Sequence, residues 1–137
     1  MAGLVVWTPE LSVKVDLFDV QHKKLIELLN TLFVAMREGH GREAVGPVIN
    51  ELLEYTKYHF SSEEKAFRQF HYPDAENHIR QHKLFVEKVT DFQTRFQHNE
   101  IMVTVEVLSF LVDWIASHIK GSDKQYSDFF MGKTISE

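Results

Sequence analysis

Cysteine is absent from this 137-residue chain, which excludes disulfide bonds, thiolate-held iron–sulfur clusters and thiol catalysis. A run of about 18 apolar residues is also absent, and the N-terminus lacks the basic and apolar segments of a signal peptide. We therefore expect no membrane insertion and a cytoplasmic location. The formal net charge of -5 gives no electrostatic support for a nucleic-acid partner.

Proline and glycine are scarce, at three and six residues, and they fall between four long stretches with helical periodicity. With 44% hydrophobic residues, the chain is expected to fold as a single domain over residues 1–137. We predict an N-terminal arm over 1–18, bundle helices over about 19–38, 42–70, 74–97 and 101–120, and a short C-terminal helix. Asp19 is the predicted N-cap of the first helix, and Gly121 is predicted to interrupt the fourth.

Each predicted helix carries an apolar seam whose members alternate in steps of three and four residues. The third helix shows it at Phe85, Val89, Phe92 and Phe96. This period is typical of helices that pack nearly parallel or antiparallel, crossing at about 20°. Because the predicted connections are short, we expect an all-α, antiparallel up-down-up-down four-helix bundle.

The seams also contain polar residues that an apolar core does not tolerate alone: His22, His59, Glu63, His78, His82 and His118. An unpaired buried ion costs several kcal/mol, against a whole-domain stability of about 5 to 15 kcal/mol. A single core histidine is usually satisfied by a backbone carbonyl or another side chain. Six such residues spread over four seams favour a shared metal site instead.

The spacing of these residues suits metal binding. His78 and His82 are four residues apart, so both imidazoles lie on one helix face, and His59 and Glu63 repeat that spacing. Asp123 lies five residues after His118, which on a continuous α-helix would separate the two side chains by roughly 140°. We expect the break at Gly121 to turn Asp123 back toward the site.

The order of these histidines and carboxylates along the chain resembles the ligand signature of the hemerythrin family in its single-domain bacterial form. The metal ligands predicted in this way are His22, His59, Glu63, His78, His82, His118 and Asp123. The local sequences Asp19-Val20-Gln21-His22, Tyr58-His59-Phe60-Ser61-Ser62-Glu63-Glu64 and Tyr72-Pro73-Asp74, together with Trp7, are also similar to that family. The resemblance implies a four-helix bundle with a non-haem di-iron centre that binds O2 reversibly.

The size of the ligand set indicates binding of one small molecule. If two six-coordinate irons share Glu63, Asp123 and an oxo or hydroxo bridge, five histidines leave a single position open. That position falls on the iron held by His22 and His59, and the family pattern assigns it in the same way. Ferritin-like oxidases use more carboxylates, so we expect oxygen storage, transport or delivery and no enzyme activity.

Five apolar residues next to the ligands are predicted to line the O2 pocket as well as the core: Leu25, Ile26, Phe60, Trp114 and Ile115. His40, His71 and His98 fall in predicted turns and are interpreted as surface residues. Glu64 and Lys65 follow Glu63 and are predicted to face outward.

Three alternatives remain open at this point. Zinc also binds histidine and carboxylate, although structural zinc prefers four closed ligands rather than seven. The same centre could carry out peroxidase or nitric-oxide chemistry, or could act as an O2 or redox sensor with a separate output protein. The expected partners are O2 and an oxygen-consuming enzyme, and a monomer is the expected state.

Overall fold

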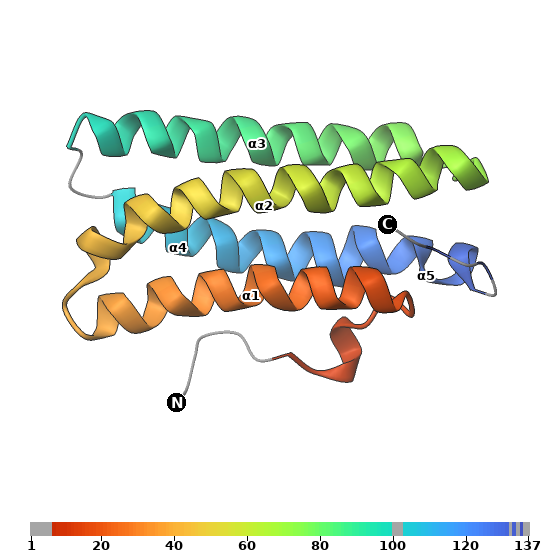
Figure 1. The fold of residues 1–137 in the computed structure, drawn as a ribbon, viewed down its shortest axis with the longest axis horizontal. Helices are drawn as coiled ribbons and strands as arrows, with labels where there is room; N and C mark the ends of the chain where they lie inside the picture. The colour runs from red at the N-terminus through yellow and green to blue at the C-terminus, as the bar shows by residue number, and fades with distance from the viewer. Residues whose placement is uncertain (1–6, 100–102, 132, 134, 136–137) are drawn as a thin grey trace.

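The computed structural model describes residues 7–99, 103–131, 133 and 135, and it forms the predicted four-helix bundle. Figure 1 shows the long helices lying side by side, with the short α5 at one end of the bundle. The elements are the 3-10 helix η1 (Pro9–Leu11), α1 (Asp16–Arg37), α2 (Gly41–Phe70), α3 (Ala75–Gln97), α4 (Val103–Trp114), the π-helix η2 (Ile115–Asp123) and α5 (Lys124–Phe130). No strand occurs within the described ranges, and none of their helices is long and apolar enough to cross a membrane.

Two hydrophobic clusters fill the bundle, and the polar seam residues lie between them. On α1, Phe18 belongs to one cluster and Leu25 to the other, with His22 between them. On α2, Phe67 and Phe60 flank Glu63 in the same way. The apolar seams therefore build the bundle on both sides of a polar layer, and this layer is where the candidate site lies.

The start of α1 differs from the prediction. The helix begins at Asp16 with Val15 as its N-cap, so the assignment of Asp19 as N-cap is wrong. The carboxylate of Asp19 instead accepts hydrogen bonds from the Ser12 hydroxyl at 2.6 Å and from the Val13 N–H at 2.8 Å. Asp19 thus fastens the arm, whose Val13 side chain is fully buried, against the end of the bundle.

Replacing Asp19 with alanine should lower the free energy of unfolding by about 1 to 2 kcal/mol, because two hydrogen bonds that hold the arm are lost. Urea denaturation followed by circular dichroism measures this change. Asp113 is an exposed aspartate on α4 and provides the control, since its replacement by alanine removes a similar charge without touching the arm. Equal midpoints for the two variants would show that the arm does not depend on Asp19.

The fourth helix also departs from the prediction. Its predicted start at Ile101 lies outside the described residues, and α4 is described from Val103 onward. Gly121 does not interrupt it: the backbone continues through Gly121 as the π-helix η2. A π-helix closes i to i+5 hydrogen bonds, so residues five apart approach the same face. This wider turn, rather than a break, brings Asp123 onto the side of His118.

Candidate metal centre

The structure brings all seven predicted ligands together in the polar layer of the bundle. Each side chain is at most 2% exposed. Their ligand atoms form two groups, each with all its atoms within 4.8 Å of one another. One group contains His78, His82 and His118 and the other contains His22 and His59, and both groups include Glu63 and Asp123. The two groups therefore lie side by side and share two carboxylates, an arrangement that could hold metal ions.

Asp123 reaches both groups with different oxygens. Its Oδ1 lies 2.8 Å from Nε2 of His78 and 3.0 Å from Nε2 of His118, while its Oδ2 lies 3.0 Å from Nε2 of His22. The π-helix is the local reason, because it places Asp123 on the face of His118 and not on the far side. One carboxylate thereby faces both groups of histidines.

Glu63, on α2, also lies between the two groups. Its Oε1 lies 3.0 Å from Nε2 of His82 and 3.6 Å from Nε2 of His59. Its Oε2 lies 3.6 Å from Nε2 of His22 and accepts a hydrogen bond from the buried hydroxyl of Tyr126. Glu63 therefore also faces both groups, and Tyr126 holds its orientation.

Most of the nitrogens and oxygens that face the centre lie within ion-pair distance of one another but form no hydrogen bond with any described residue. Nε2 of all five histidines, Oε1 of Glu63 and both oxygens of Asp123 are buried without a hydrogen-bond partner in the part of the chain that the structure describes. Thr56, another buried polar residue on α2, is satisfied by the Leu52 carbonyl at 2.6 Å. Buried polar atoms in native proteins are almost always satisfied. These eight atoms have no hydrogen bond of the kind that satisfies Thr56, and imidazole nitrogens and carboxylate oxygens are donors that fit metal ions.

The outward ring nitrogens of three histidines have partners that sequence reasoning missed. His59 Nδ1 lies 2.5 Å from Gln21 Oε1, His118 Nδ1 lies 2.8 Å from Gln81 Oε1, and His82 Nδ1 lies 2.9 Å from Glu64 Oε2. Metal-bound histidines commonly donate their other N–H in this way, which leaves Nε2 free for the metal. In all three cases the partner is next in sequence to a predicted ligand, and this adjacency could have indicated the partners.

The charges of the centre favour cation binding. Burial opposes protonation of His22 and His78, but the adjoining carboxylates of Asp123 and Glu63 raise the pKa of each to about 9. Burial instead lowers the pKa of His59 to about 3. Burial also opposes ionisation of Glu63, yet the surrounding histidines hold the pKa of that carboxyl well below its usual range. Without metal, imidazole protons balance the buried carboxylates, and metal cations would displace those protons.

The comparisons with known proteins agree with this geometry. A family model described as "Hemerythrin HHE cation binding domain" matches residues 13–129. The chain belongs to the hemerythrin family. It is 38% identical over 126 residues to a bacteriohemerythrin of Stenotrophomonas maltophilia, covering 92% of this chain and 81% of that relative. The resemblance inferred from the ligand order is therefore confirmed.

Further hemerythrins show the same relationship in sequence and in fold. A bacteriohemerythrin of Methylococcus capsulatus is 32% identical over 125 residues, covering 90% of this chain and 95% of the relative. A crystal structure of wild-type hemerythrin superposes with a TM-score of 0.82 at 31% identity, covering 91% of this chain and 96% of that one. The likeness extends over nearly the whole bundle and confirms the predicted fold.

The other residues singled out from the sequence fall in two classes. Leu25, Ile26, Phe60 and Ile115 are buried in the cluster on one side of the centre, and Trp114 packs against that cluster. The ring of Phe60 stacks on His82 with centroids 3.8 Å apart, and that of Trp114 stacks on His118 at 4.3 Å.

The three remaining histidines, His40, His71 and His98, are exposed. The outward orientation predicted for Glu64 is wrong, because its carboxylate contacts His82.

Proposed function

We propose that this protein binds O2 reversibly at two non-haem iron ions. Family membership and the buried histidine–carboxylate cluster support an iron-dependent O2-binding protein. The single observation that supports two irons rather than one is that Glu63 and Asp123 belong to both ligand groups. In this proposal His22 and His59 hold one iron, and His78, His82 and His118 hold the other.

The unequal numbers of histidines support binding of one small molecule. The group with two histidines supplies one donor fewer, so its iron is where an exchangeable ligand would bind. When bound, the iron pair would supply the electron density that holds O2. The protein would enclose that position, since Leu25 and Ile26 follow His22 by about one helical turn and are only 3% and 4% exposed. We assign them, with Phe60, Trp114 and Ile115, to the pocket that excludes water.

Storage, transport or delivery of O2 is the role that this site supports best. With metal bound, the chain would supply two carboxylates and five neutral imidazoles, a set with less negative charge than the four carboxylates of ferritin-like di-iron proteins. Less negative charge disfavours strongly oxidising metal states, so we propose binding without turnover. An oxygen-consuming enzyme is the proposed recipient.

Metal analysis combined with optical spectroscopy tests the proposal. The purified protein should contain two irons per chain and should change reversibly between a coloured form in air and a nearly colourless form after anaerobic reduction. Zinc at full occupancy with little iron would overturn the choice of metal. Irreversible bleaching on the first exposure to air, or steady consumption of added peroxide that His22→Ala abolishes, would overturn binding without turnover.

A further inference from the structure

The two halves of the centre differ in what supports their histidines from outside. On the half with three histidines, His82 contacts a carboxylate, that of Glu64, whereas His118 contacts the amide oxygen of Gln81. On the half with two histidines, His59 contacts the amide oxygen of Gln21. Nδ1 of His22 has no hydrogen-bond partner among the described residues. A carboxylate is therefore found behind only one of these four imidazoles.

Carboxylate and amide partners affect the donor strength of a metal-binding histidine differently. A negatively charged acceptor attracts the Nδ1 proton more strongly than a neutral amide does, so Nε2 becomes a stronger donor to its metal. A stronger donor stabilises the higher oxidation state. The plane of the His82 ring is fixed separately by Phe60, whose ring lies 5° from parallel to it. Glu64 therefore has an electronic effect that is separable from holding the ring in place.

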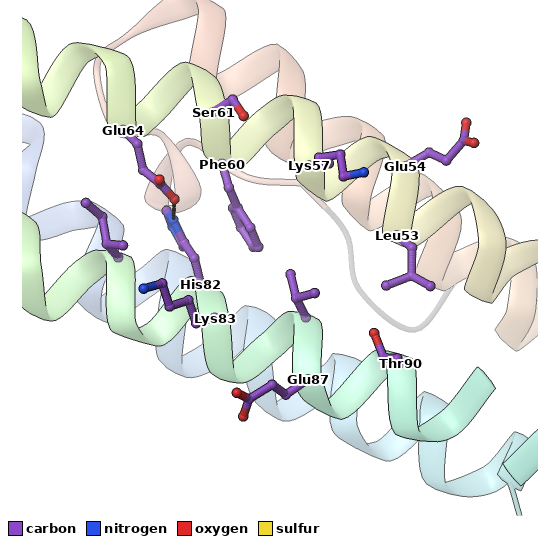
Figure 2. A pocket seen from close by; sticks show the side chains of 12 residues that line it. Leu53, Glu54, Lys57, Phe60, Ser61, Glu64, His82, Lys83, Glu87 and Thr90 are labelled. Carbon is purple, nitrogen blue, oxygen red and sulfur yellow. Dashed lines mark hydrogen bonds and ion pairs between the residues drawn. The ribbon is translucent and has the colours of Figure 1, made fainter. Parts of the chain in front are cut away.

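Glu64 differs from Glu54, another acidic residue of α2, in its contact with a histidine and in its exposure to water. Figure 2 shows Glu64 reaching His82 at one end of a groove between α2 and α3, while Glu54 lies further along the same groove. The side chain of Glu64 is 23% exposed, so it is partly shielded from water and its charge is screened less than that of Glu54, which is exposed.

We propose that Glu64 is a positioning residue that makes the three-histidine metal harder to reduce than its two-histidine neighbour. The inference rests on the proposed iron pair and concerns its redox balance. Because the Glu64 carboxylate makes Nε2 of His82 a stronger donor, it stabilises the oxidised state of the metal that His82 binds. It thereby strengthens O2 binding, which draws electron density from the metals, and also promotes spontaneous oxidation of the reduced protein.

The test uses the iron-loaded protein and the conservative substitution Glu64→Gln, which keeps the length and the acceptor oxygen but removes the charge. An anaerobic redox titration should show the reduced state favoured about tenfold more than in the wild type, a shift of about 59 mV for one electron. Autoxidation in air should slow and O2 affinity should fall. Glu54→Gln removes a carboxylate from the same groove without touching a histidine, so it should leave all three quantities unchanged.

A second variant keeps the test decisive if Glu64→Gln loads iron poorly. Gln81→Glu places a carboxylate behind His118 on the same metal, and it should shift the titration in the opposite direction, toward the oxidised state. The combined Glu64→Gln/Gln81→Glu protein should lie close to the wild type.

The outcomes separate this inference from the proposed function. A wild type without two irons or without reversible colour overturns the proposed function itself. A wild type that binds O2, with Glu64→Gln and Glu54→Gln giving the same potential, or with Gln81→Glu shifting in the same direction as Glu64→Gln, overturns only the role of Glu64.

Discussion

Replacing Glu63 with alanine should abolish metal binding at both positions, lowering the iron content from two per chain to near zero. Both ligand groups include this carboxylate, and its oxygens lie 3.0 Å from His82 Nε2 and 3.6 Å from His22 Nε2. Losing a shared anionic ligand weakens both metals together, whereas losing one histidine removes a ligand from only one group. Metal analysis after reconstitution with excess Fe(II) measures the effect.

The control for this prediction is His40→Ala, which removes an exposed histidine outside the centre and should retain two irons. His59→Ala provides a graded comparison, since His59 belongs to one group only. Full iron loading of Glu63→Ala would contradict a bridging role. Equal losses in Glu63→Ala and His59→Ala, with one iron remaining in each, would instead mean that Glu63 serves a single metal.

Much of the fold could be predicted because the apolar seams and the turn residues point to the same helices. Phe85, Val89 and Phe92 repeat at helical spacing and are all buried in the structure. The ends of the helices were less predictable, because side chains compete locally for the same backbone groups. Asp19 has the residue type of an N-cap, yet its carboxylate bonds to Ser12 and Val13 of the arm. Only the tertiary position of the arm decides between these alternatives.

The candidate ligands could be found from sequence because a buried histidine is costly unless it has a partner. What the sequence did not indicate was how Asp123 reaches the centre. Gly121 is an ordinary signal for the end of a helix, whereas a π-helix has no comparable residue pattern. The outer partners were missed for a different reason: Glu64 lies on the edge of the buried face of α2, and periodicity alone does not decide whether such a side chain turns inward.

Removing the metals should destabilise the protein strongly. Nine buried side-chain atoms of the centre have no hydrogen-bond partner among the described residues, and they belong to five histidines and two carboxylates. Burying ionisable groups without full compensation costs several kcal/mol, and metal binding to the native state alone adds directly to stability. We expect chelation to lower the free energy of unfolding by roughly 4 kcal/mol and the melting temperature by roughly 10 to 15 °C.

Differential scanning calorimetry of one preparation, before and after removal of iron under reducing conditions, measures this shift. Glu63→Ala is the informative comparison, because a protein that cannot hold the metals should melt at the same temperature with and without chelator. His40→Ala should show the full wild-type shift. An unchanged melting temperature in verified iron-free wild-type protein would mean that the seven side chains are satisfied without metal. The unpaired Nε2 atoms would then have found partners by a rearrangement of the polar layer between the two hydrophobic clusters.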